Sequence, residues 1–356
     1  MNRRIALLTG LLLVLLLAAL PVLAGCGDDE TTTDTTEAAE TTDTSDATEE
    51  TTETSEADAA AASGETYNIG ITQIVSHPAL DAVAQGFKDA LEEEGIQANF
   101  DEQNAQGELP VASTIAEKFV ADNVDLILAI ATPTSQAAVQ ATDEIPVLFA
   151  AVTDPVAAGL VDDPENPTAN VTGVSDKLPM QPHLDLVQEL VPDIQTLGVI
   201  YNAGEANSVA LVEEERQLAE EMGWEVQEAT VASSAEVLSA AQSLIGRVDA
   251  ISVLTDNTVV SAFESVVKVG QENGIPVIAG DIDSVERGAA AAYAFDYYEH
   301  GRQAGRMAAR WLTGTPIDQL PVEFAQDLVL AVNPASAEQM GITIPDAMQQ
   351  EAGEVF

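Results

Sequence analysis

From Tyr67 onward, short runs of apolar and β-branched residues alternate with segments whose apolar residues recur at helical spacing. Strands are expected at residues 67–74, 97–103, 125–130 and 147–152, and again at 197–201, 225–231, 250–254 and 277–280. Helices are expected between them, at 79–94, 110–122, 134–142, 182–191, 208–222, 234–245 and 258–273. Continuous apolar strands between amphipathic helices are typical of parallel sheets covered on both faces. The sequence therefore predicts an α/β protein with two doubly wound parallel-sheet lobes.

Further elements are expected after residue 285, namely a strand at 289–295, a long helix at 297–313 and a strand at 324–332. Ser233 followed by Glu236 three residues later is the pattern of a capping box, so we expect it to start the helix at 234–245.

The first 25 residues have the layout of a secretory signal. Asn2-Arg3-Arg4 is positively charged, residues 5–23 are almost all apolar, and Leu23-Ala24-Gly25 leads to Cys26, the only cysteine. This ending resembles a bacterial lipoprotein signal, in which cleavage precedes the cysteine and its thiol carries lipid. We therefore expect lipidation at Cys26. The alternative is a signal-anchor helix, because the apolar run is just long enough to span a bilayer.

Residues 26–65 are expected to form a disordered tether. Residues 27–65 are rich in Thr and contain 14 acidic residues, no basic residue and no aromatic residue. Such a segment buries too little apolar surface to offset its conformational entropy.

The charge of the chain excludes several functions. It has 60 acidic and 12 basic residues, a formal net charge of −48, so binding of nucleic acid through a basic patch is excluded. One Cys excludes an intramolecular disulfide framework, and three scattered His residues do not suggest a metal cluster. No GxSxG, HExxH, P-loop or GxGxxG pattern is present, so we expect neither enzyme activity nor a cofactor.

Polar residues gather just after the expected strands, which is where open α/β sheets bind ligands. The candidates for ligand contact are Gln73, His77, Thr132, Thr134, Thr153, Asp154, Ser175, Asn202, Asn207, Ser208, Asp256, Thr258 and Asp281. For any single residue, the alternative is that it only caps a helix or closes a turn.

Several stretches resemble bacterial ABC-transporter substrate-binding proteins of the tryptophan/tyrosine type. They are HPALD at 77–81, FAAVTDPV at 149–156, NVTGVSD at 170–176, GVIYN at 198–202 and VLTDNT at 253–258, within a resemblance that covers residues 66–345. The resemblance implies a type I periplasmic-binding fold with a three-strand hinge, crossing near 175–180, 284–288 and 316–322. Lobe I would comprise residues 66–174 and 288–316, and lobe II residues 175–287 and 317–356.

The residues themselves favour a zwitterionic or neutral ligand, because no Arg is evidently aimed at the expected cleft. A helix N-terminus suits a carboxylate, and the helix at Asn207-Ser208 is preferred over that at Thr132–Thr134. For an ammonium group, Asp256 is preferred, followed by Asp154 and Asp281. Ile74, Pro133 and Phe149 are candidate apolar walls, although for Phe149 a place in the core of the first lobe is preferred.

We therefore expect an extracytoplasmic, lipid-anchored, monomeric solute-binding protein that passes an amino acid to an ABC permease and its ATPase. The alternative is a surface receptor that presents solute to a membrane sensor. A transcriptional repressor would need a basic DNA-binding head, and the N-terminus is instead an export signal.

Overall fold

The computed structural model describes residue 64, residues 66–167 and residues 170–356. The expected signal at 1–25, the expected lipidation site Cys26 and, apart from Gly64, the expected tether at 26–65 lie outside the described residues. Among the residues described, no helix combines the length and apolar character needed to span a membrane.

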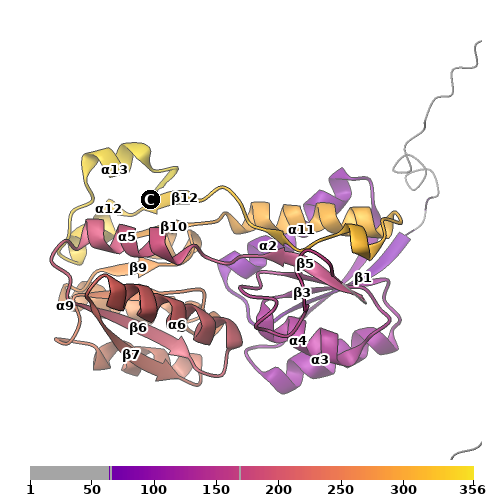
Figure 1. Cartoon of the computed structure of the whole chain (residues 1–356), viewed down its shortest axis with the longest axis horizontal. Helices are drawn as coiled ribbons and strands as arrows, with labels where there is room; N and C mark the ends of the chain where they lie inside the picture. Colours follow the sequence, from indigo (N-terminus) through magenta and orange to yellow (C-terminus); the bar gives the residue numbers. More distant parts are fainter. Residues whose placement is uncertain (1–63, 65, 168–169) are drawn as a thin grey trace, which may run out of the picture. The chain divides into compact units, whose positions relative to one another are not determined.

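The first lobe is built on a six-stranded sheet whose strand pairs are all parallel. Its order is β11-β5-β4-β3-β1-β2, and the strands are β1 (Thr66–Gln73), β2 (Gln97–Asn104), β3 (Leu126–Ile130), β4 (Val147–Ala150), β5 (Val171–Ser175) and β11 (Glu323–Phe324). The helices of this lobe are α2 (Pro78–Glu93), α3 (Leu109–Ala121), α4 (Thr132–Ala141) and α11 (Tyr297–Leu312), with the short η2 (Ile317–Gln319) after them (Figure 1). Strands β3, β4 and β5 are fully buried, as expected for a sheet covered on both faces.

The second lobe has a seven-stranded sheet, in the order β13-β12-β10-β9-β8-β6-β7. Its strands are β6 (Thr196–Asn202), β7 (Glu225–Val231), β8 (Ala250–Val253), β9 (Val277–Ala279), β10 (Ala291–Ala294), β12 (Val329–Val332) and β13 (Glu354–Val355). Its helices are α5 (Met180–Leu190), α6 (Ala206–Glu221), η1 (Ser234–Glu236), α7 (Val237–Ser243), α8 (Asn257–Val260), α9 (Phe263–Asn273), α10 (Asp283–Glu286), α12 (Pro334–Gln339) and α13 (Asp346–Glu351). Only β10 and β12 pair antiparallel among the described strands. The predicted fold class, two parallel-sheet lobes, is confirmed.

The first crossing between the lobes lies within the expected range, whereas the second and third lie elsewhere. Strand β10 does not return to the first lobe but pairs with β9 and β12, and the chain returns only afterwards, through α11, η2 and β11. The expected strand at 324–332 is two strands, β11 in the first sheet and β12 in the second. The crossings are therefore at 176–179, 295–296 and 325–328, against the expected 175–180, 284–288 and 316–322.

These differences have physical reasons. The pattern of a buried strand does not specify which sheet it joins, because its partners are distant in sequence. Between β11 and β12, Asp327 adopts a left-handed conformation, φ 63°, which a strand cannot contain and which Asp tolerates better than most residues. The helix expected at 258–273 is likewise interrupted, between α8 and α9. The expected capping box does not form, since the Ser233 side chain makes no cap and Glu236 accepts the N–H of Ala232.

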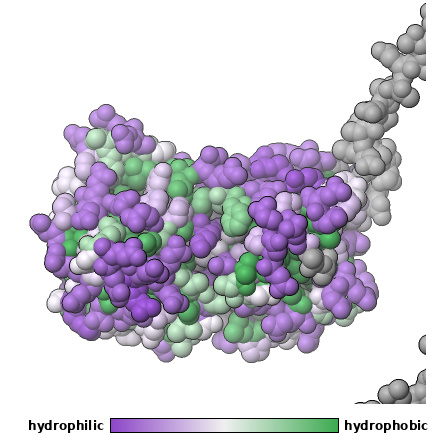
Figure 2. All heavy atoms as spheres, viewed as in Figure 1, coloured by the Kyte–Doolittle hydropathy of each residue, from purple (hydrophilic) through white to green (hydrophobic). Residues whose placement is uncertain are grey.

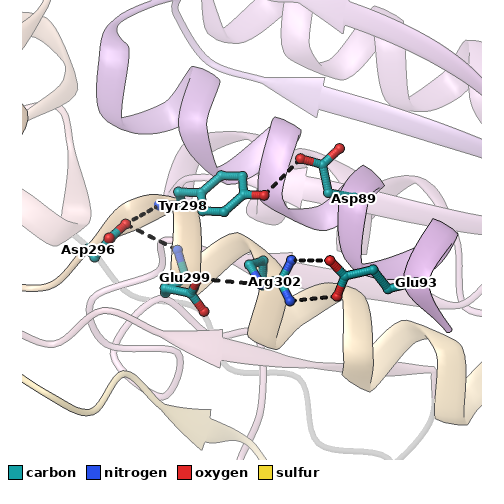
Figure 3. A network of polar contacts seen from close by, with 6 residues as sticks. All are labelled: Asp89, Glu93, Asp296, Tyr298, Glu299 and Arg302. Atoms are coloured by element: carbon teal, nitrogen blue, oxygen red, sulfur yellow. Dashed lines mark hydrogen bonds and ion pairs between the residues drawn. The ribbon is translucent and has the colours of Figure 1, made fainter.

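Helices α2 and α11 pack against each other, although α2 begins the first lobe and α11 belongs to the later segment that returns to it. They approach closely because Gly86 and Gly301 lie at their contact, where a β-carbon on Gly301 would overlap the Val83 carbonyl oxygen. Polar contacts flank the glycines (Figure 3): Arg302 forms a bidentate pair with Glu93, with N–O distances of 2.9 and 2.6 Å, and the Tyr298 hydroxyl donates to Asp89 at 2.9 Å.

Charged and polar residues cover most of the face shown in Figure 2, with apolar residues in small patches. Most of the few basic side chains pair with acids, as in Arg287–Glu264 at 2.8 Å and Lys88–Glu102 at 3.0 Å. The large excess of acid is therefore left uncompensated at the surface, which favours solubility and repels anionic macromolecules.

The core of the second lobe contains a buried polar group formed by His183, Glu215 and Ser252. His183 Nε2 lies 2.9 Å from Ser252 Oγ and 3.8 Å from Glu215 Oε1, and all three side chains are fully buried. Burial raises the pKa of Glu215 to about 8 and lowers the pKa of His183 to about 4. Both groups are therefore mainly neutral at pH 7.

We predict that Gly301→Ala destabilises the protein by about 1–3 kcal/mol, because the added methyl group forces α2 and α11 apart. Chemical denaturation measures the free energy of unfolding, with Arg306→Ala on the exposed side of α11 as control. Equal stability of Gly301→Ala and the wild type would refute the close packing.

The Glu215→Gln variant should gain stability relative to the wild type as the pH rises from about 5 to 8. The folded-state pKa of Glu215 is raised, so its contribution is complete below the unfolded pKa and is lost as the pH rises through the folded pKa. Glutamine cannot ionise and avoids this loss. Thermal melting across this pH range measures the difference, and the exposed Glu189→Gln controls for the loss of one charge. A difference between Glu215→Gln and the wild type that does not change with pH would contradict the burial of an ionisable acid here.

Candidate functional site

A cavity lies between the two lobes, where loops after strands of both sheets meet. The first lobe contributes loops after β1, β4 and β5, and the second contributes the start of α6 and the loops after β8 and β9. The lining residues are His77, Ala79, Leu80, Ala151, Thr153, Asp176, Asn207, Thr255, Asp256, Asn257, Val260, Asp281 and Tyr297.

Five of the predicted contact residues line this cavity: His77, Thr153, Asn207, Asp256 and Asp281. Sequence reasoning missed four other polar lining residues, which are Asp176, Thr255, Asn257 and Tyr297. Asp176 follows a strand as the predicted residues do, so the same rule would have found it. Tyr297 had no such signal, because it begins a helix just after the second crossing between the lobes.

Four of the remaining candidates have local structural roles. Gln73 donates to Asp81 at 2.6 Å, and Thr134 donates to the Ile130 carbonyl at 2.5 Å within its own helix start. Ser175 donates to the Thr153 carbonyl at 3.0 Å. Ser175 therefore supports Thr153, a cavity residue, but does not line the cavity itself.

Asp154 accepts the N–H groups of residues 156 and 157 and so caps a turn. Thr132 and Ser208 are buried and do not line the cavity, and the Thr132 hydroxyl makes no hydrogen bond to the described protein atoms.

A second, larger groove adjoins the cavity at Asn257. Asn202 and Thr258, the last two candidates, lie there, with Asn202 Nδ2 donating to Thr258 Oγ1 at 2.9 Å. The expected apolar walls Ile74 and Pro133 also line the groove rather than the cavity, and Phe149 is a fully buried core residue. The apolar part of the cavity wall is formed instead by Ala79, Leu80, Ala151 and Val260.

Three buried carboxyl groups, those of Asp176, Asp256 and Asp281, face the cavity, and no Lys or Arg is among its lining residues. Burial raises the pKa of all three. For Asp256 the neighbouring Glu205 carboxylate adds to burial, and the pKa reaches about 7. A positively charged group in the cavity would offset this penalty, so the site favours a cation.

The three carboxyl groups differ in how much acceptor capacity remains. Asp256 accepts the N–H groups of Val259 at 2.8 Å and Asn202 at 2.6 Å, one on each oxygen. Both oxygens of Asp281 accept from Ser284, at 2.7 Å each.

Asp176 is held on one side only. Its Oδ2 accepts the Tyr297 hydroxyl at 2.7 Å, whereas its Oδ1 has a single long contact, 3.4 Å, with Thr153 Oγ1. Asp176 therefore has the most accessible oxygen for a ligand.

The N-terminus of α2 faces the cavity through Ala79 and Leu80. Their backbone N–H groups have no acceptor within the helix, and the side chain of the N-cap residue His77 makes no capping bond. Burial, then the Arg287 charge, lowers the pKa of His77 to about 4, so its ring is neutral at pH 7. His77 Nδ1 is buried without a partner among the described protein atoms.

His300, on α11, holds the loop after β4 in place. The N–H of Ala151, a residue with φ 54°, donates to His300 Nε2 at 2.9 Å. Among the described residues, no group of three or more His, Cys, Asp or Glu is arranged to hold a metal ion.

Comparison with known proteins gives a consistent result. Residues 68–356 match the model of the family "ABC transporter substrate binding protein". A "Tyrosine-binding protein" from Clostridioides difficile is 43% identical over 270 residues, covering 75% of this chain and 78% of the relative. A Streptococcus pneumonia ABC domain in complex with L-Trp is 37% identical with a TM-score of 0.79, covering 82% of this chain and all of that one.

A third similar structure differs in conformation. The ligand-free, open structure of a substrate-binding protein with adhesive properties from Clostridium difficile is 41% identical and covers 81% of this chain and 99% of that one, but its TM-score is 0.63.

Proteins of this family bind solutes outside the cytoplasm and are not enzymes. The two parallel-sheet lobes, the cavity between them and the match over residues 68–356 agree with this assignment. The chain belongs to the ABC transporter substrate-binding protein family, with the type I periplasmic-binding fold.

Proposed function

We propose that this protein captures an amino acid, of the aromatic kind that its relatives bind, in the cavity between the lobes. The observation that carries the proposal is the set of three buried carboxyl groups around a cavity that no Lys or Arg lines. An α-ammonium group would neutralise part of this charge, and the relatives described as binding tyrosine or L-Trp support the ligand class.

The ammonium group binds Asp176 in this proposal, and Asp256 and Asp281 surround it. The sequence favoured Asp256 for the ammonium group. We assign Asp176 instead, because both Asp256 oxygens already accept backbone N–H groups. Thr153, which contacts Asp176, is placed to accept a second ammonium proton.

The ligand carboxylate binds the N–H groups of Ala79 and Leu80 at the start of α2. The sequence favoured the start of α6 for the carboxylate instead. There the side-chain amide nitrogen Nδ2 of Asn207 already donates to the Thr255 carbonyl at 3.1 Å. The ligand side chain then packs against the apolar part of the wall, including Leu80 and Val260.

The bound solute is delivered to a membrane ABC permease driven by its ATPase. The family assignment supports this partnership, and the sequence at the N-terminus supports anchoring by lipid on Cys26, with residues 27–65 as a tether. Such an anchor keeps the binding domain near the permease and raises its effective concentration there.

Asp176→Asn is expected to weaken binding of L-tyrosine or L-tryptophan at least about tenfold, because a charged hydrogen bond contributes about 1.5–3 kcal/mol. Isothermal titration calorimetry on the full-length protein measures the affinity, with melting of the ligand-free variant to check its folding. Asp154→Asn, which removes a carboxylate outside the cavity, should bind as the wild type does. Unchanged affinity in a folded Asp176→Asn variant would remove Asp176 from the site.

Cys26→Ala should release the protein from membranes, because the lipid can no longer be attached. Fractionation of expressing cells, followed by immunoblotting of membrane and soluble fractions, measures the change. Continued association of the variant with membranes would favour the signal-anchor helix.

A further inference from the structure

Three side chains that line the cavity carry a buried polar atom with no hydrogen-bond partner among the described protein atoms. The atoms are His77 Nδ1 from the first lobe and Asn207 Oδ1 and Thr255 Oγ1 from the second. A buried polar atom that is left unpaired costs free energy, and a ligand that pairs with it recovers that cost. These atoms therefore indicate which hydrogen bonds the bound ligand has to make.

The side-chain amide of Asn207 is held in one orientation. Its Nδ2 donates to the Thr255 carbonyl oxygen at 3.1 Å and lies 3.3 Å from Ser208 Oγ. A carbonyl oxygen only accepts hydrogen bonds, so the amide nitrogen has to be the atom that faces Thr255. Oδ1 is consequently the atom left for the ligand, and it is a pure acceptor on a side chain that is only 5% exposed.

Thr255 adds a polar group of a different kind. Because its carbonyl binds Asn207 Nδ2, the two residues form one hydrogen-bonded unit on the second lobe. The Thr255 hydroxyl can both donate and accept, whereas Asn207 Oδ1 can only accept. A ligand hydroxyl, which donates one hydrogen bond and accepts another, would therefore satisfy both residues at once.

We propose that Asn207 and Thr255 determine the specificity of the site by selecting tyrosine through its phenol hydroxyl. The phenol O–H donates to Asn207 Oδ1, and the phenol oxygen accepts the Thr255 hydroxyl. The inference rests on the proposed function, because it assigns the side-chain contacts of the amino acid whose ammonium and carboxylate groups are placed there.

This assignment agrees with the placement of the rest of the ligand. Asp176 follows β5 and the start of α2 follows β1, so the proposed ammonium and carboxylate sites both lie on the wall formed by the first lobe. His77 precedes α2, and its Nδ1 therefore belongs to the carboxylate end of the ligand. The ligand side chain then extends past Val260 toward the second lobe, to which Asn207 and Thr255 belong.

The aromatic amino acids differ in how far they satisfy this pair of residues. The tyrosine hydroxyl pairs with both. The tryptophan indole N–H can donate to Asn207 Oδ1 but cannot accept from Thr255, and phenylalanine leaves both unpaired. A site built to hydrogen-bond a ligand hydroxyl rejects the analogue that lacks it. Phenylalanine should therefore bind roughly tenfold to hundredfold more weakly than tyrosine.

Isothermal titration calorimetry on the full-length protein tests the proposal with L-tyrosine, L-phenylalanine and L-tryptophan. Asn207→Leu should abolish the preference for tyrosine over phenylalanine, because these two ligands differ only by the hydroxyl. Thr255→Val, which keeps the shape of the side chain, should weaken tyrosine binding roughly threefold to tenfold and leave tryptophan binding unchanged. Asn273→Leu, on α9 and outside the cavity, is the matched control and should bind all three ligands as the wild type does. Melting of each ligand-free variant checks its folding.

Equal affinity of the wild type for tyrosine and phenylalanine overturns this inference and leaves the proposed function standing. A folded Asn207→Leu variant that loses affinity for both by the same factor also overturns it, since Asn207 would then bind a part that the two ligands share. Should Asn207→Leu fail to fold, Thr255→Val decides, and an equal loss for tyrosine and tryptophan, or no loss, contradicts the inference. If the wild type binds none of the three amino acids, the proposed function fails and the inference fails with it.

Discussion

The burial of Asp176, Asp256 and Asp281 around one cavity is the constraint on which the rest of the site depends. A buried carboxyl group is costly unless it is hydrogen-bonded or neutralised. Asp256 and Asp281 accept donors from their own loops, and Asp176 accepts the Tyr297 hydroxyl from α11. All three carboxyl groups lie on loops that follow the carboxyl ends of parallel strands. In the proposed function, the acceptor capacity left on Asp176 selects for a cationic group, which an amino acid supplies as its ammonium.

Helix α11 connects this chemistry to the motion between the lobes. It begins directly after the second crossing, and its first residue, Tyr297, donates to Asp176 beside the first crossing. Its glycines seat it against α2, whose N-terminus faces the ligand cavity. A hinge closure confines its backbone changes to a few residues, so we expect α2 and α11 to stay packed together as one wall of the site.

Much of the fold could be predicted from the alternation of apolar strands and amphipathic helices, since both are local patterns. The sheet joined by β10 could not, because strand pairing depends on residues distant in sequence. The rule that ligands bind after parallel strands found His77, Asn207 and Asp281. It could not tell that Thr134 bonds its own helix start or that Asp154 caps a turn, because cap residues and ligand residues are the same types at the same positions.

A crystal structure of the full-length protein grown with L-tyrosine or L-tryptophan tests the central claim most directly. The account predicts a ligand between the lobes with its ammonium nitrogen within about 3 Å of the Asp176 carboxylate and its carboxylate at the start of α2. A ligand bound outside this cavity, or one whose carboxylate faces Asp176, would contradict the account.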